Sequence, residues 1–159
     1  MLARISVCIV TNFAASATDM LLHIIARGRI GHGPEAELVE RYMRRISWKQ
    51  KISELSDTGG RVPPAAENSR TVILDEKGEH LSSVELARLL ERWRDDGVRE
   101  TRFLIGAADG FNDAGRSGAD KLIAFGKATW PHLMARAMLA EQLFRATSII
   151  ANHPYHREG

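Results

Sequence analysis

The residues with the clearest chemical potential lie in the last third of the chain. Residues 126–132 (GKATWPH) stand directly before a long apolar segment that begins at Leu133. A glycine, a β-branched residue, an aromatic and a proline ahead of a helix predict a stiff loop that presents backbone N–H groups at the helix N-terminus. Such a loop can hold a polar ligand through its main chain alone.

A second group of candidate residues follows the same apolar segment. Residues 152–157 (NHPYHR) are dense in hydrogen-bonding and titratable groups. A helix ending near Ala151 would fix the point at which this tail emerges. For an unknown chain, the simplest interpretation of such a terminus is a frayed end without a role.

The rest of the chain alternates between strand and helix patterns. Short apolar runs at 21–26, 71–75, 102–106 and 121–125 predict buried strands, and 48–55 is a further, poorly patterned strand candidate. Helices are expected from Pro34, from Ser82 with Glu85 as a capping box, over 112–121, and after Leu133. In the first of these, Leu38, Tyr42 and Ile46 recur at helical spacing, with Val39 and Met43 beside them. The order predicts an α/β fold, a parallel sheet with helices on both faces.

Parallel sheets bind ligands at the carboxyl ends of their strands. Three such ends are informative here: Leu74 with Asp75, Gly106 with Ala107, and residues 126–131. Gly106 would allow a ligand to approach the backbone closely, and main-chain groups of 126–131 would be free to bind a base or a sugar. Taken singly, Gly106 and Gly126 are more simply explained as turn glycines.

Composition restricts the class of protein. The 159 residues are enough for a single domain, hydrophobic content is 44%, and no apolar run has the length of a membrane span. A formal charge of only +2 argues against a protein that coats nucleic acid nonspecifically, although most basic residues are Arg, which favours bidentate phosphate contacts. The single cysteine, Cys8, excludes an intrachain disulfide and agrees with a reducing cytoplasm.

The first 19 residues do not fit the pattern that follows. A signal peptide is one interpretation, with Arg4 ahead of an apolar stretch and a small-residue site near Ala17, but the stretch is short and Asn12 interrupts it. We favour an upstream start assignment, so that 1–19 is a non-native extension and 20–159 is the domain.

Two other kinds of site are disfavoured by spacing. Gly28, Gly31 and Gly33 follow the first strand but do not match the dinucleotide fingerprint, which argues against a nucleotide-dependent oxidoreductase. His132, His153 and His156 lack a cysteine or carboxylate partner at metal-ligand spacing, so no metal is expected. Exposed arginines near the glycines, including Arg27, Arg29, Arg44 and Arg45, leave a role in RNA contact open.

Four segments in this order resemble one family. Residues 103–110 (FLIGAADG), 129–132 (TWPH), 140–146 (AEQLFRA) and 152–157 are similar to the RlmH (YbeA) family, and the resemblance extends over about 20–158. Residues 20–26 look like a family N-terminus. The family usually has a second glycine at Ala107 and a bulkier residue, often proline, at Ala108.

The resemblance implies a fold, a reaction and a set of site residues. RlmH proteins are homodimeric SPOUT-class enzymes with a deep C-terminal trefoil knot, and they use S-adenosylmethionine to methylate N3 of a pseudouridine in large-subunit ribosomal RNA of the assembled ribosome. By resemblance, three strand-end loops form the cofactor pocket. The residues concerned are Leu74, Asp75, Gly106, Ala107, Gly126, Lys127, Ala128, Thr129, Trp130 and Pro131.

The acceptor nitrogen must lose its proton, so a base or a cation is needed beside the donor. His156 is the best candidate for the base, Arg157 for neutralising charge or holding a phosphate, and Tyr155 for stacking on a nucleobase. Arg136 is expected to form part of a solvated helix face, or to face the partner or the RNA. The alternative function is a noncatalytic ribosome-binding protein that kept the fold.

Overall fold

A parallel sheet forms the centre of the fold. The computed structural model describes residues 20–58, 61–106 and 113–156, and the expected extension 1–19 lies outside them. Within this part of the chain the sheet has five strands in the order β2-β1-β4-β3-β5. They are β1 (Leu21–Arg27), β2 (Gln50–Leu55), β3 (Ser69–Glu79), β4 (Glu100–Ile105) and β5 (Lys121–Ile123).

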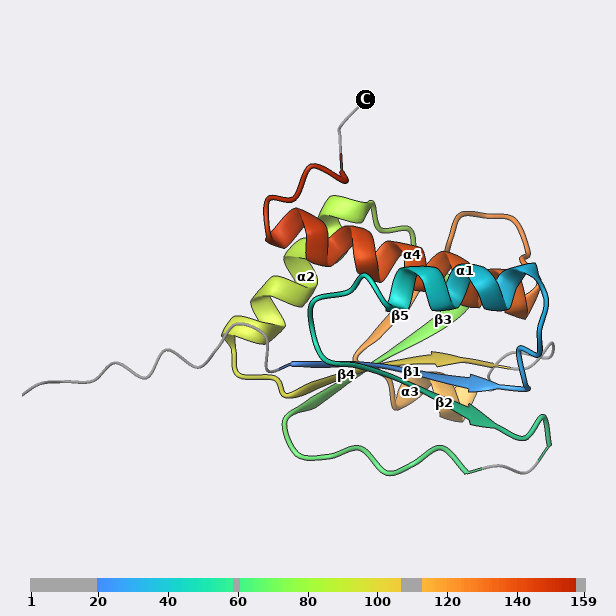
Figure 1. Ribbon diagram of the computed structural model, residues 1–159. Helices are drawn as coiled ribbons and strands as arrows, with labels where there is room; N and C mark the ends of the chain where they lie inside the picture. The colour runs from blue at the N-terminus through green and yellow to red at the C-terminus, as the bar shows by residue number, and fades with distance from the viewer. Residues whose placement is uncertain (1–19, 59–60, 107–112, 157–159) are drawn as a thin grey trace, which may run out of the picture.

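Helices cover both faces of the sheet, as the sequence predicts. Helices α1 (Pro34–Met43), α2 (Ser83–Asp95) and α4 (His132–Ile150) lie on one face, and the short α3 (Asp113–Ser117) lies on the other (Figure 1). Helix α4 packs between α1 and α2. The expectation of a helix over 112–121 was too long, because α3 gives way to β5 after only five residues.

Local signals set most helix boundaries. Pro34 begins α1, and the capping box at α2 is complete, with Glu85 N donating to Ser82 Oγ at 3.2 Å and Ser82 N donating to Glu85 Oε2 at 2.7 Å. The predicted apolar face of α1 packs into the core except at Leu38. Leu38 is 36% exposed, whereas Val39 and Met43 are buried, since that edge of α1 faces the sheet and α4.

Two hydrophobic clusters lie on opposite faces of the sheet. The larger one joins alternate residues of the strands, such as Leu22, Ile24 and Phe103, to the inner faces of α1, α2 and α4. The smaller one is built on Ile25, Ile73 and Leu104, with Leu122 packed against it. Burial on both faces explains why these strands read as continuous apolar runs.

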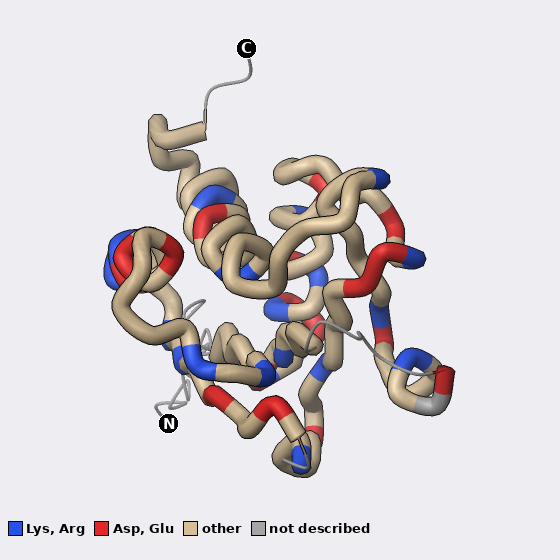
Figure 2. The backbone as a smooth tube through the Cα atoms, turned by 90° about the vertical axis from the view of Figure 1, so that its right-hand side faces the viewer, with Lys and Arg blue, Asp and Glu red and all other residues tan. Residues whose placement is uncertain are grey.

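Strand register brings the predicted loops to one edge. Glu54, Ala26, Ile105, Leu74 and Ile123 occupy one row across the sheet in neighbouring strands. At or just after this row β1, β2, β4 and β5 end at a common edge, which Figure 2 views face on, whereas β3 shifts register after Leu74 and continues to Glu79. Everything that binds at the carboxyl ends of the strands must bind here.

Candidate functional site

A cavity of about 550 Å³ opens at the carboxyl edge of β3, β4 and β5. This volume lies in the range of small-molecule sites. Its lining comes from the ends of β4 and β5, from β3 next to its register shift after Leu74, and from the start of α4. The strand that was predicted to end at Asp75 therefore does not end there, because β3 continues to Glu79. The lining residues are Leu74, Asp75, Glu76, Ile105, Gly106, Arg116, Ile123, Ala124, Phe125, Gly126, Ala128, Thr129, Trp130, Pro131, His132 and Ala135.

Most of the predicted cofactor residues line this cavity. Lys127 does not, because its exposed side chain belongs to the outer part of the loop, and Ala107 lies outside the described residues. Three lining residues with polar side chains, Glu76, Arg116 and His132, were not among the predicted ones. Arg116 stands in a segment weakened by glycines. His132 belongs to the loop that the sequence singled out, but its side chain was weighed as a metal ligand and not as part of the cofactor site.

The loop before α4 has a fixed shape. Gly126 has φ +88, a left-handed conformation that side chains other than glycine rarely adopt. The indole Nε1 of Trp130 donates to the carbonyl oxygen of Phe125 at 2.8 Å and so closes the loop. A Cβ placed on Gly126 would meet nothing within 4 Å, so the requirement for glycine here is conformational rather than steric.

Opposite charges meet on another wall of the cavity. Arg116 Nε donates to Asp75 Oδ2 at 2.8 Å, and the side chain of Asp75 is only 3% exposed. Burial alone would raise the pKa of Asp75, but the Lys77 amide and the Arg116 guanidinium bind its carboxylate, and the net effect lowers that pKa. The pair is therefore ionised at neutral pH and presents a cation and an anion side by side.

The predicted catalytic tail does not reach this cavity within one copy of the chain. The Tyr155 ring packs on the Phe144 ring, with 4.4 Å between the two centroids. The guanidinium of Arg145 lies 4.9 Å from the centroid of the Tyr155 ring. The Tyr155 hydroxyl donates to Glu141 Oε1 at 3.2 Å. Glu141 follows His132 by nine residues, which is about 13 Å along the helix. Arg157 lies outside the described residues.

The environment of the tail determines what its groups can do. Burial, and then contacts with Tyr42 and Glu141, raise the pKa of Tyr155 to about 12. Its phenol is therefore protonated at neutral pH. His156 Nδ1 lies 3.4 Å from Arg145 Nη1, and since arginine only donates, Nδ1 accepts. His156 Nε2 is buried and has no hydrogen-bond partner within the described residues.

A second cavity of about 490 Å³ lies between the loop, the start of α2 and the middle of α4. It shares Ala124, Phe125 and Gly126 with the first cavity, and Glu141 lines its other side. Glu141 also binds Tyr155 and forms an ion pair with Arg145. Glu141 therefore contacts the tail and also lines the cavity that borders the loop.

Arg136 corrects a prediction. It was expected on a solvated helix face, or facing a partner or RNA, but it is fully buried, at 0% exposure. Its Nη1 lies 2.6 Å from Glu54 Oε1, and its Nη2 donates to the carbonyl oxygen of Gly28 at 3.0 Å. A carboxylate on β2 and carbonyls at the end of β1 neutralise and bind the guanidinium, which explains how it is tolerated in the core.

One further polar cluster resembles a catalytic arrangement. His23 lies 2.6 Å from Glu100 Oε1 through Nδ1, and 2.8 Å from Ser53 Oγ through Nε2. The three residues stand on β1, β4 and β2, and none of them lines either cavity. They satisfy one another across neighbouring strands, which is the ordinary fate of buried polar groups.

Two kinds of feature are absent from the described residues. No helix there combines the length and apolar character needed to cross a membrane. No group of three or more His, Cys, Asp or Glu side chains in the same ranges is arranged to hold a metal ion.

Comparison with known proteins gives concordant matches. The family described as Predicted SPOUT methyltransferase matches residues 20–156. A Sphingopyxis alaskensis protein named Ribosomal RNA large subunit methyltransferase H is 79% identical over 140 residues, which cover 88% of this chain and 99% of that protein. A protein of the same name from Novosphingobium aromaticivorans is 70% identical over 141 residues, covering 88% and 100%.

A solved structure supports the fold independently. The crystal structure titled as a probable methyltransferase from Bordetella pertussis superimposes with a TM-score of 0.55 at 12% identity. The superposition covers 82% of this chain and 96% of that one. At this identity the likeness concerns the fold alone.

Proposed function

The chain belongs to the SPOUT methyltransferase family and, within it, to the ribosomal RNA large subunit methyltransferase H family, and from this premise we propose its reaction. The enzyme transfers a methyl group from S-adenosylmethionine to N3 of a pseudouridine in large-subunit (23S) ribosomal RNA, and it acts on the assembled ribosome. A ribosomal substrate makes the cytoplasm its place of action.

One observation carries the proposal. The carboxyl ends of β4 and β5, the part of β3 beside its register shift, and the start of α4 line a single cavity, although their residues are spread from Leu74 to Ala135. These are the loops that the family resemblance assigns to the cofactor. A small-molecule site at this edge is what a parallel sheet favours on physical grounds.

The cavity suits S-adenosylmethionine in size and charge. Its volume of about 550 Å³ accommodates a ligand of that size, and the backbone at Gly126 is open to close approach. Asp75 and Arg116 offer an anion and a cation to the ammonium and carboxylate of the amino-acid end. When bound, the cofactor supplies an electrophilic methyl group on a sulfonium, which needs no metal.

The protein's own residues then have to orient the nucleobase and accept the imide proton. Orientation accounts for most of the rate in such a transfer, because it replaces an encounter by a bound geometry. His156 remains the predicted base, and Arg157 the predicted cation. Tyr155, protonated at neutral pH because its pKa is about 12, is suited to stacking and hydrogen-bond donation rather than to removing a proton.

A homodimer would bring the tail and the cofactor together. Within one copy, Tyr155 and His156 stand against the second half of α4, while the cavity lies at its first turn. Next to the cavity, Trp130 is 41% exposed and Met134 is 40% exposed, which is unusual for large apolar side chains. A second copy covering them would also supply a tail, and would offer a partner to His156 Nε2.

We further infer the deep trefoil knot of the family. In that arrangement the C-terminal segment passes through a preceding loop, which would make the loops that line the cavity hold one another in place. Knots are rare enough that only the family relationship supports this one.

Methyl transfer to ribosomes tests the function directly. Ribosomes from a strain lacking the corresponding gene are incubated with the enzyme and isotopically labelled S-adenosylmethionine, and the RNA is digested and analysed by mass spectrometry. N3-methylated pseudouridine in 23S RNA is expected. Binding to ribosomes without cofactor binding or transfer would refute the proposal and favour the noncatalytic alternative.

Light scattering tests the dimer. The mass at micromolar concentration should be twice that of the 17.7 kDa chain. Met134→Glu, which places a charge on the exposed apolar surface, should shift the mass toward the monomer and lower methyl transfer, while cofactor affinity changes little. A monomeric wild-type enzyme with full activity would contradict the shared site.

A further inference from the structure

An ion pair between the buried Arg136 and the solvent-accessible Glu54 holds the backbone on both sides of one exposed arginine. Arg136 Nη2 donates to the carbonyl oxygen of Gly28 at 3.0 Å, and the backbone N of Ile30 donates to Glu54 Oε1 at 2.9 Å. Arg136 and Glu54 bind each other at 2.6 Å. The residue between the two fixed points is Arg29, whose side chain is exposed.

The contacts of Arg136 and Glu54 fix the backbone path around Arg29. Removing the guanidinium of Arg136 from water is unfavourable, and its burial is offset only by close contacts with a carboxylate and with carbonyl oxygens. Here the side chain of Arg136 is 1% exposed, and its Nε has no partner within the described residues. An apolar residue would fill the same core space, but it would not fix the path of the chain around Arg29.

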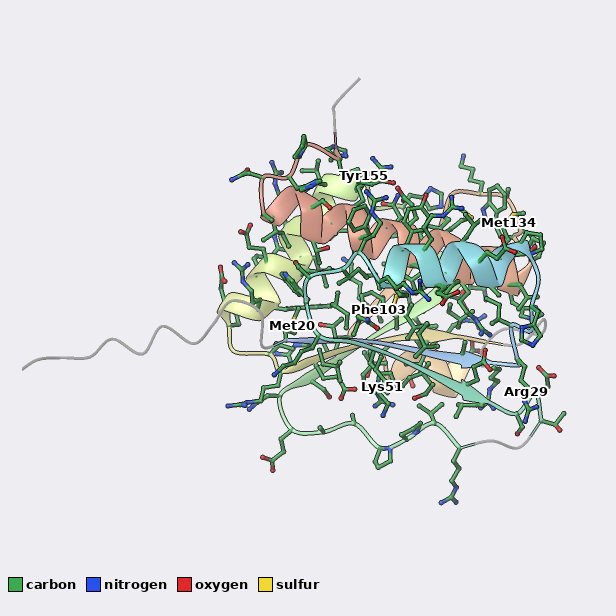
Figure 3. All side chains as sticks on the ribbon, in the orientation of Figure 1. Met20, Arg29, Lys51, Phe103, Met134 and Tyr155 are labelled. Carbon is green, nitrogen blue, oxygen red and sulfur yellow. The ribbon has the colours of Figure 1, made fainter. Side chains whose placement is uncertain are left out.

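The fixed loop adjoins the cofactor cavity. Gly28 follows the end of β1, at the edge where the cavity opens, and His132 Nε2 lies 3.8 Å from the position that a Cβ on Gly28 would occupy. His132 itself lines the cavity. In Figure 3, Arg29 and Met134 both lie at this end of the molecule. Arg29 is therefore held close to the place where a substrate must approach.

Because the surface charge is mixed, a single well-placed arginine can contribute much of the affinity for RNA. Acidic and basic positions are interspersed over the edge seen in Figure 2, and the formal charge of the chain is only +2. Such a surface has no dominant field to attract RNA, so affinity must come from individually placed cations. No carboxylate among the described residues forms an ion pair with Arg29 in this structure.

We propose that Arg29 contacts a phosphate of the ribosomal RNA substrate, and that the Arg136–Glu54 pair is the positioning device that aims it. The inference rests on the proposed function and names how that site recognises its partner. The planar guanidinium matches two phosphate oxygens at once, which fixes the RNA backbone in orientation as well as position. This contact thereby positions the target nucleotide relative to the cofactor cavity.

A pair of matched variants tests the contact. Arg29→Gln removes the charge at the proposed site, and Arg92→Gln removes an equal charge from the last turn of α2, which precedes the amino end of β4. Methyl transfer to ribosomes is measured at several salt concentrations. Arg29→Gln should raise KM for ribosomes about tenfold at low salt and reduce the salt dependence by about one phosphate contact.

The Arg92 variant should match the wild type in both quantities. The dissociation constant for S-adenosylmethionine, measured by calorimetry, should be unchanged in either variant. Equal KM and equal salt dependence for both variants would overturn the proposal. A raised KM with unchanged salt dependence for Arg29→Gln would also overturn it, and would point to a ribosomal protein as the contact.

A third variant tests the positioning role. Glu54→Gln keeps the volume of the side chain but removes the charge that pairs with Arg136. It should raise KM for ribosomes with little change in cofactor affinity, and its effect should shrink when Arg29→Gln is already present. Fully additive effects would refute the link. Absence of transfer by the wild-type enzyme would refute the proposed function itself, whereas an active wild type with a neutral Arg29→Gln refutes only this inference.

Discussion

Gly126→Val should weaken cofactor binding while the protein stays folded. Gly126 lines both cavities and has φ +88, and a Cβ there would meet nothing within 4 Å. The substitution therefore acts through the backbone rather than by a clash. A β-branched residue is strained in the left-handed region, so the loop should relax to another conformation in the free enzyme.

The expected loss follows from that strain. A residue other than glycine in this conformation costs about 1 to 3 kcal/mol, and we take about 2 kcal/mol for valine. If binding requires the original loop shape, the ligand must supply this difference, because the competent state is only fractionally populated. At 1.4 kcal/mol per factor of ten, the dissociation constant for S-adenosylmethionine should rise about thirtyfold.

The chain contains a matched control. Gly97 has φ +83 and also has nothing within 4 Å of a Cβ, but it ends α2 and lines neither cavity. Its N donates to the carbonyl oxygen of Arg94 at 3.1 Å, so strain there disturbs a helix end. Gly97→Val should lower Tm by about 4 to 8 °C for the same strain of about 2 kcal/mol, and should leave cofactor affinity unchanged.

Calorimetry for the cofactor and thermal melting for stability separate the two effects. Gly126→Val should change affinity with little change in Tm, and Gly97→Val should do the reverse. If both variants bind the cofactor as the wild type does, the loop at Gly126 is not part of the cofactor site. If Gly126→Val lowers Tm as much as Gly97→Val, the loop supports the fold and the argument from a relaxed free state is wrong.

Two more changes give definite outcomes. Asp75→Asn should destabilise the protein by about 1 to 2 kcal/mol at pH 7, since Arg116 loses its carboxylate. The pKa of Asp75 is lowered in the folded state, so this contribution to stability is present above the unfolded value of about 3.9 and is lost as pH falls through the folded pKa. In denaturant titrations, the free energies of unfolding of the wild type and the variant should converge below about pH 4. A difference in unfolding free energy that stays constant with pH would contradict this. Deleting residues from Tyr155 onward should leave cofactor affinity within a few fold but lower methyl transfer at least about a hundredfold, the scale of a lost acid–base group. Normal transfer by the truncated enzyme would show that the tail has no catalytic role, and loss of cofactor binding would show that it closes the cofactor site.

The fold was largely predictable because local patterns and long-range packing agree. Apolar runs such as residues 21–26 become β1, buried on both faces, and the capping box at Ser82 begins α2 where expected. The prediction failed where local pattern was ambiguous. On α1 the inward edge holds Val39 and Met43 rather than Leu38, and only the docking of α1 against the sheet and α4 decides between adjacent stripes.

The cavity was partly predictable for a topological reason. Once a parallel sheet is expected, the residues after each strand must meet at one edge, and this brings Gly106 and Gly126 together. Leu74 joins them although its strand continues to Glu79, because β3 shifts register directly after it. Arg116 and His132 were not predicted as cavity residues, because nothing in their local sequence indicates which way their side chains point. The position of the tail was also not predicted, since it depends on Glu141 and Phe144, which read as ordinary residues of an apolar helix.

Arg136 shows what separates pattern from structure in this chain. The sequence predicts that Arg136 shares a solvated helix face with Glu141 and Arg145, which are four residues apart. The Glu141–Arg145 ion pair indeed forms. The partner of Arg136, Glu54, is 82 residues away and stands on a strand with little pattern. Long side chains on a helix lean toward its N-terminus, which directs Arg136 to the strand ends rather than to solvent. The register that places Glu54 opposite Ala26 then puts the carboxylate where the guanidinium arrives. The ion pair, and through it the position of Arg29 beside the cavity, is thus a property of the assembled sheet and becomes visible only when the strands are paired.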